Sequence, residues 1–140
     1  MGEPDSTLER LDDQINWYDR KSVYNQKAYK SIKVIEIVSA AVVPLSAGLH
    51  LPAAITGSLG VLIAVLEGLL QLNQYHHNWI AYRSTSETLK HEKYLYLANA
   101  GPYSTPANAH ALLAERIESL VSQEDAKWAS AQEESTKQKN

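Results

Sequence analysis

Residues Ala53–Leu72 read AAITGSLGVLIAVLEGLLQL and carry a single charged residue, Glu67. Their number matches the ~20 residues that an α-helix needs to cross the hydrocarbon core of a bilayer. About ten Leu, Ile and Val side chains favour insertion by ~3–6 kcal/mol, whereas one carboxylate at the centre of a span costs up to ~3 kcal/mol. Because Glu67 lies off the centre, the balance favours a membrane span.

A second apolar stretch, Val34–Leu49 (VIEIVSAAVVPLSAGL), precedes the first and is separated from it by only a few residues. It is short for a span, and Glu36, Pro44 and His50 interrupt it, so we expect it to enter a membrane only as the partner of the stronger span. The alternative is a soluble helical hairpin buried in a large protein core. The insertion balance favours the transmembrane hairpin.

Polar segments with helical spacing flank the hairpin. We expect one domain organised as a cytoplasmic helix leading into the first span, a transmembrane hairpin, a cytoplasmic extension of the second span, a C-terminal cytoplasmic helix and a flexible tail, at residues 6–33, 34–72, 73–99, 106–130 and 131–140. The predicted fold class is therefore an all-α membrane protein, a two-transmembrane helical hairpin with long cytoplasmic helical extensions and a packed C-terminal helix in a homo-oligomeric bundle.

Basic residues gather on one side of the predicted spans. Lys27, Lys30 and Lys33 precede the first span, Arg83 and Lys90 follow the second, and the turn between the spans has no Lys or Arg. By the positive-inside rule both termini are cytoplasmic, and we expect the inner membrane of a bacterium as the location.

Composition excludes several classes of protein. The net charge of −3 gives no basic excess for nucleic-acid binding, and the absence of cysteine excludes disulfides, thiolate metal sites and a cysteine nucleophile. The neighbouring His76 and His77 point to different helix faces, so we predict no metal site. No catalytic motif is present, and we expect neither an enzyme nor a cofactor.

Polar and small side chains share one face of the second span if its helix continues without a break. At 100° per residue this face holds Thr56, Gly60, Ala64, Glu67, Gln71, Gln74 and Asn78. On the first helix, Lys33, Glu36, Ala40, Val43 and Ala47 share a face, with Ser39 and Ser46 at its margin. In an antiparallel hairpin Glu36 and Glu67 reach a similar depth.

Three interpretations of these intramembrane polar residues stay open. Glu36 or Glu67 pairs with Lys33 as a purely structural contact, or Glu67 forms an acidic ring that lines a pore, or a carboxylate relays protons. Two spans cannot enclose a water path alone, so both transport interpretations require a homo-oligomer. Helix packing would use Pro44, which we expect to kink the first span, and the small residues Gly60, Ala64 and Gly68.

The segment Leu66–Tyr103 resembles the SLATT family of bacterial two-transmembrane proteins (SMODS and SLOG-associating 2TM effector domains). The resemblance rests on Glu67-Gly68, Trp79 with Tyr82-Arg83, Glu92-Lys93-Tyr94 and Gly101-Pro102-Tyr103, together with Glu36, Pro44, Glu118, Glu124 and Trp128 elsewhere in the chain. It implies a membrane-permeabilising effector that is triggered by a nucleotide-sensing or nucleotide-generating partner protein. The chain carries no fused sensor, so a housekeeping channel is also consistent with it.

A polar network is predicted on the cytoplasmic side. Its residues are Trp79, Tyr82, Arg83, Glu92, Glu118 and Trp128. Arg83 is placed to pair with Glu87 one helical turn later, and we expect Glu92, with Glu118 or Glu124, to bind Arg83 or Lys90. This network would clamp the C-terminal helix onto the extended second helix.

These features together predict an oligomeric ion-conducting or membrane-permeabilising pore. The expected partners are the lipid bilayer, other copies of the chain in a cyclic homo-oligomer and a nucleotide-linked protein, without nucleic acid. The alternative function is a non-conducting, membrane-anchored scaffold whose cytoplasmic helices bind a partner protein.

Overall fold

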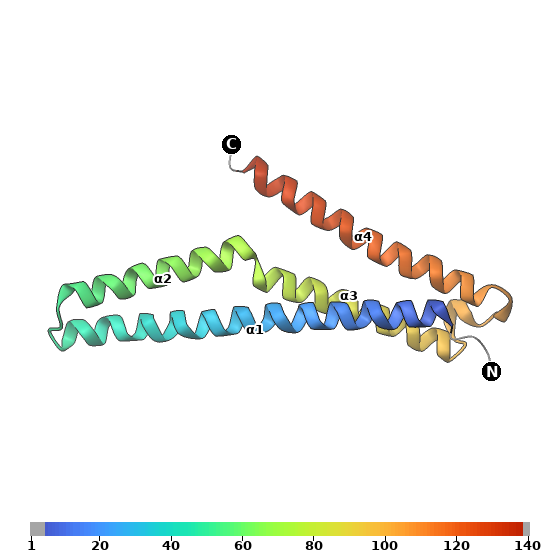
Figure 1. Ribbon diagram of the computed structural model, residues 1–140, viewed down its shortest axis with the longest axis horizontal. Coiled ribbons are helices and arrows are strands. Elements are labelled where there is room, and N and C mark those ends of the chain that lie inside the picture. Colours follow the sequence, from blue (N-terminus) through green and yellow to red (C-terminus); the bar gives the residue numbers. More distant parts are fainter. Residues whose placement is uncertain (1–4, 139–140) are drawn as a thin grey trace. The chain divides into compact units, whose positions relative to one another are not determined.

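Residues 5–138 are described by the structure, a computed structural model, and every regular element among them is helical (Figure 1). The elements are α1 (Ser6–Gly48), α2 (Ala53–Asn73), α3 (Tyr75–Leu97), the short 3-10 helices η1 (Gly101–Tyr103) and η2 (Pro106–Asn108), and α4 (Ala109–Lys137). The prediction of an all-helical chain is confirmed. The predicted N-terminal lead before residue 5 and the last two residues of the predicted tail lie outside the described residues.

Helix α1 merges the predicted N-terminal helix and the first apolar stretch into one helix of 43 residues that continues through Pro44. No Gly or Pro precedes Pro44 within the helix, so nothing interrupts its backbone hydrogen bonds earlier. The helix is capped by Asp5, whose carboxylate accepts a hydrogen bond from the backbone N–H of Thr7 at 3.1 Å. The sequence had indicated Ser6 or Thr7 as the cap, and the structure corrects this by one or two residues.

The second apolar helix ends at Asn73 rather than continuing without a break toward residue 99. Gln74 adopts a left-handed conformation with φ 48°, and α3 begins at the next residue. Two side chains satisfy backbone carbonyl groups at this break: Asn73 Nδ2 donates to Leu69 O at 3.0 Å, and Asn78 Nδ2 donates to Asn73 O at 3.1 Å. Because neither Gly nor Pro marks the site, the break was not predicted.

Helix α4 continues to Lys137, which is seven residues beyond the predicted end of the C-terminal helix. The segment AQEESTK that was expected to be a flexible tail is rich in Ala, Gln, Glu and Lys, which are strong helix formers. Residues 125–137 are all exposed, so their helicity comes from propensity rather than from packing.

The chain divides into two compact units. We call residues 20–82 the hairpin unit, and residues 5–19 with 83–138 the terminal unit. The terminal unit has an ordinary apolar core, whose buried members are Leu11, Ile15, Tyr18, Leu89, Tyr103, Ala109, Leu113 and Ile117. On α1 the buried Leu11, Ile15 and Tyr18 follow the three- and four-residue spacing of one helix face.

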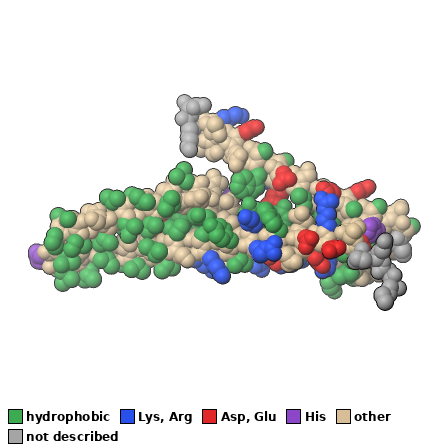
Figure 2. Space-filling model, viewed as in Figure 1, with side chains coloured by type: hydrophobic (Ala, Val, Ile, Leu, Met, Phe, Trp, Pro, Cys, Tyr) green, Lys and Arg blue, Asp and Glu red, His purple; other side chains and the backbone are tan. Residues whose placement is uncertain are grey.

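Burial in the hairpin unit is inverted relative to a soluble protein. Ser39 and Ser46 are 7% and 1% exposed, whereas Val38, Leu45 and Val61 are 57%, 60% and 65% exposed. Hydrophobic side chains accordingly cover the outer surface of the α1–α2 hairpin in Figure 2. Both helices are long and apolar enough to span a membrane by length and composition, and only 11% and 6% of their apolar windows are buried. A core helix of a soluble protein would be mostly buried instead.

Candidate functional site

A charged triad joins the two apolar helices. Lys33 Nζ on α1 lies 3.2 Å from Glu36 Oε2 on the same helix and 3.1 Å from Glu67 Oε2 on α2. Gln71 Nε2 donates a hydrogen bond to the other carboxylate oxygen of Glu67 at 3.4 Å. The two carboxylates therefore meet at one level of the hairpin, and a single ammonium leaves the triad with a net charge of −1.

The side chains of the triad differ in exposure. The side chain of Glu36 is 16% exposed, whereas that of Glu67 is 41% exposed and that of Lys33 is 35% exposed. Glu67 thus combines a neutralising contact within the hairpin with an accessible outer surface. This arrangement includes the structural pairing predicted for Lys33, and it keeps Glu67 available to an aqueous path or to another copy of the chain.

A second polar contact lies near the turn of the hairpin. Ser46 on α1 hydrogen-bonds Thr56 on α2, with 2.9 Å between the hydroxyl oxygens, and Ser46 also bonds the carbonyl oxygen of Val43 at 2.8 Å. Ser39 and Ser46, which were expected at the margin of the polar face of α1, are its most buried members. The interior of the hairpin is therefore built from hydroxyls and a charged triad at its two ends.

The small residues of α2 lie away from α1. Gly60 and Ala64 are exposed, and a Cβ added at Gly60 or Gly68 would meet nothing within 4 Å. The stripe Gly60, Ala64 and Gly68 therefore does not provide close packing inside the hairpin. Gln71, which is also exposed, extends this open surface toward the end of α2.

The break at Gln74 separates two predicted residues from the polar face of α2. An uninterrupted helix would align Gln74 and Asn78 with Glu67 and Gln71. In the structure Gln74 forms the left-handed junction, and the side chain of Asn78 bonds the last carbonyl of α2. Both residues shape the junction between α2 and α3.

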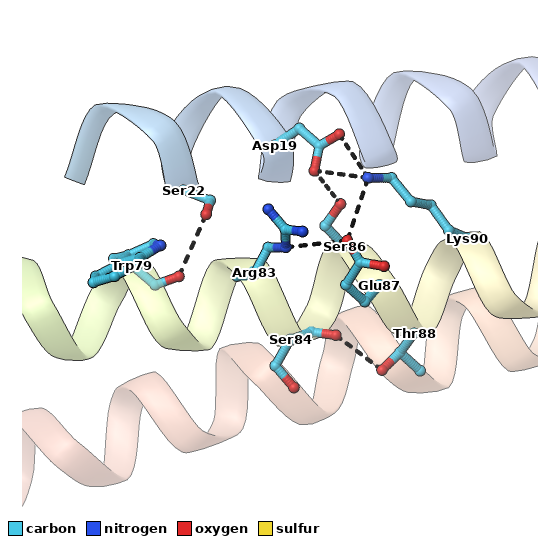
Figure 3. A network of polar contacts seen from close by, with 9 residues as sticks. All are labelled: Asp19, Ser22, Trp79, Arg83, Ser84, Ser86, Glu87, Thr88 and Lys90. Atoms are coloured by element: carbon cyan, nitrogen blue, oxygen red, sulfur yellow. Dashed lines mark hydrogen bonds and ion pairs between the residues drawn. The ribbon is translucent and has the colours of Figure 1, made fainter. Parts of the chain in front are cut away.

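Trp79 belongs to an aromatic cluster in the hairpin unit. The Tyr29 ring lies 4.8 Å from the His76 ring and 6.5 Å from the Trp79 ring, and Lys30 Nζ sits 5.5 Å from the centre of the Trp79 ring. Ser22 Oγ is 3.5 Å from the carbonyl oxygen of Trp79 (Figure 3). Tyr82 lies on α3 in the same unit and is half-buried.

A buried ionic cluster fixes α4 in the terminal unit. The carboxylate of Glu92 on α3 accepts bonds from Arg116 Nε and Nη2 on α4, at 2.9 and 2.8 Å, and a further bond from the hydroxyl of Tyr103. The side chain of Glu92 is only 6% exposed. The hydrogen bond from Arg116 holds the pKa of Glu92 below its usual value against the opposing effect of burial, and burial with the nearby carboxylate raises the pKa of Tyr103.

A second cluster joins α1 to α3 within the terminal unit. Asp19 accepts a hydrogen bond from Ser86 and an ion pair from Lys90 at 3.0 Å, while Arg83 pairs with Glu87 at 3.0 Å (Figure 3). The hydrogen bond from Ser86, followed by the ammonium of Lys90, lowers the pKa of Asp19. The Arg83–Glu87 pair is the one predicted from helical spacing.

The remaining predicted network residues take other partners. Glu118 pairs with Arg10, at side-chain exposures of 56% and 63%, and Trp128 is 38% exposed near the outer end of α4. Glu124 is the last buried residue of α4, and burial raises its pKa although the hydroxyl of Tyr18 bonds it. Its Oε1 atom has no hydrogen-bond partner.

Sequence reasoning located the clamp on α4 but missed its main cation. Arg116, Tyr103 and Asp19 are the residues that complete the two clusters, whereas Lys90, Glu118 and Glu124 were the expected partners. One signal was available. Arg116 lies on the same face as the apolar Leu113 and Leu120, so its cationic end lies close to the packed side of α4.

No group of three His, Asp or Glu side chains within residues 5–138 has the geometry to hold a metal ion. Every acidic residue of the hairpin unit is committed to Lys33. The clusters are therefore ionic contacts between helices, and none has the layout of a catalytic site.

These observations define a class of protein: an all-helical chain with two long, apolar and largely uncovered helices joined to a unit with an ordinary core. Within that class the chain belongs to the family described as Protein of unknown function (DUF4231), whose model matches residues 13–111. The match covers both apolar helices, the triad and the clusters around Asp19 and Glu92, and ends within the first turn of α4. No curated protein and no solved structure matches the chain.

Proposed function

We propose that the α1–α2 hairpin spans a membrane and that several copies assemble around α2 to form an ion-conducting or membrane-permeabilising pore. The inverted burial of the hairpin unit carries this proposal. Leu, Val and Ile side chains face outward, and Ser39, Ser46 and the charged triad lie between the helices. Such a surface suits hydrocarbon on the outside and polar contacts on the inside.

The triad explains how two carboxylates are accommodated in an apolar segment. Ionised groups inside a membrane are costly unless they are paired, and Lys33 pairs with both Glu36 and Glu67. The exposed stripe of Gly60 and Ala64 leaves room for the helix of a second copy, because nothing in the same chain fills it. In a ring of copies the partly exposed Glu67 would give the mouth of the pore a negative potential that attracts cations.

The distribution of Lys and Arg favours both termini in the cytoplasm and the bacterial inner membrane as the location. The resemblance to SLATT proteins adds a role as an effector triggered by a nucleotide-sensing or nucleotide-generating partner. The exposed outer half of α4, residues 125–137, favours the second candidate function, a membrane-anchored scaffold that binds a partner protein without conducting.

Conductance of the detergent-purified, full-length protein in planar bilayers tests the pore. Discrete currents that lose cation selectivity in Glu67→Gln would support it. Glu133→Gln removes the same charge from the exposed end of α4 and is expected to leave selectivity unchanged. Currents with unaltered selectivity in Glu67→Gln would remove this residue from the pore lining, and the absence of currents in a correctly inserted protein would favour the scaffold.

A further inference from the structure

We propose that Lys27, Lys30 and Trp79 form a binding surface for the phosphate groups of anionic phospholipids. The inference rests on the membrane placement proposed above and names the lipid class that the hairpin prefers. It concerns only the hairpin unit, and it does not depend on whether the protein conducts ions.

Charge within the hairpin unit is unbalanced at one end. Residues 20–82 hold five Lys and Arg side chains but only two carboxylates, and both carboxylates bind Lys33. Lys27 and Lys30 are exposed. Neither has an ion pair among residues 5–138. Their charges are therefore uncompensated within the protein and are open to an external anion.

The depth of the two lysines matches a layer of lipid headgroups. Lys30 and Lys27 precede Val34, the first residue of the apolar stretch, by four and seven residues. At a rise of 1.5 Å per residue their backbones lie about 6 and 10 Å outside the hydrocarbon, and the headgroup layer on each side is roughly 5–8 Å thick. Flexible lysine stems can reach phosphate groups from these depths.

Trp79 completes the surface from the second arm of the hairpin unit. Its ring lies 5.5 Å from the ammonium of Lys30 and is braced by His76 and Tyr29 at 5.7 and 6.5 Å. An indole at the level of the headgroups anchors a helix end in the interface. The cation–π contact holds Lys30 at that level without neutralising its charge, so the ammonium stays able to bind a phosphate.

The preference for anionic lipid is measurable by tryptophan quenching in vesicles. Full-length protein is reconstituted into phosphatidylcholine vesicles that contain brominated phosphatidylglycerol or, separately, brominated phosphatidylcholine, and the selectivity for the anionic lipid is obtained from the quenching of Trp79. Trp79→Phe identifies the part of the signal that belongs to this residue. We expect an anionic preference that falls roughly fivefold for each lysine removed.

The test variant is Lys27→Gln/Lys30→Gln, and the matched control is Lys127→Gln/Lys137→Gln, which removes two exposed charges from α4. The inference predicts loss of the preference in the first variant and its retention in the second. Equal quenching by the two lipids in the wild type, or a preference retained in Lys27→Gln/Lys30→Gln, would overturn the inference alone. Absence of quenching by either lipid would overturn the membrane placement as well.

Discussion

Removing Arg116 should loosen α4 more than removing any other cation of the terminal unit. In Arg116→Leu the carboxylate of Glu92 loses two charged hydrogen bonds at 2.8 and 2.9 Å and keeps only the hydroxyl of Tyr103. Breaking a fully buried ion pair costs ~3–5 kcal/mol. Since the Arg116 side chain is 45% exposed, water replaces part of the lost interaction, and we expect ~2 kcal/mol.

Amide hydrogen exchange of residues 109–124, measured on full-length protein in detergent, reports this loss locally. A cost of ~2 kcal/mol corresponds to exchange about 30-fold faster. Arg10→Leu is the matched control, because the Arg10–Glu118 pair also reaches α4 but both side chains are more than half exposed. An exposed pair contributes at most ~1 kcal/mol, and we expect acceleration of about twofold for the control.

Partial rescue would identify the unpaired carboxylate as the cause. Adding Glu92→Gln to Arg116→Leu removes the buried charge and should slow the exchange again. Exchange in Arg116→Leu that matches Arg10→Leu within twofold would refute the reasoning, because Glu92 would then not depend on its cation.

Three further variants probe other features of the terminal unit and the helix junction. Burial raises the pKa of Glu124 above 4.5, so its contribution to stability is greatest below that pH and is lost as the pH rises through the folded value. Glu124→Gln should therefore stabilise the protein in thermal melts at pH 8 but not at pH 4, and an equal effect at both pH values would contradict this. Gln74→Gly should raise the melting temperature, by ~0.5–1 kcal/mol of stability, because glycine adopts φ 48° without strain, whereas Gln74→Val should lower it. Ser86→Ala should cost ~1 kcal/mol in chemical denaturation and shift acid unfolding to higher pH, because Asp19 loses the hydrogen bond that lowers its pKa.

Periodicity predicted the helices well because it reflects local spacing. The stripe Leu11, Ile15 and Tyr18 and the apolar run of α2 can both be read from residue types alone. The junction at Gln74 could not be predicted, because it depends on side chains of Asn73 and Asn78 bonding particular carbonyl groups. Such bonds carry no distinctive sequence signal.

The candidate site was predictable only in part for a related reason. Equal distances from the turn brought Glu36 and Glu67 to one level, and helical spacing paired Arg83 with Glu87. The cation that binds Glu92 depends on how α4 packs on α3, and spacing within one helix carries no information about that packing. Long-range partners were therefore missed, whereas partners one turn apart were found.

The orientation of the hairpin in a membrane is the central claim, and labelling of single cysteines tests it most directly. The chain has no cysteine, so His50→Cys at the turn and Ser104→Cys after α3 each introduce one reactive site. In sealed vesicles a membrane-impermeant maleimide should label only one of the two variants from outside. Lysing the vesicles should expose the other. Labelling of both variants from the same side, or a protein that stays in solution without detergent, would contradict the transmembrane hairpin.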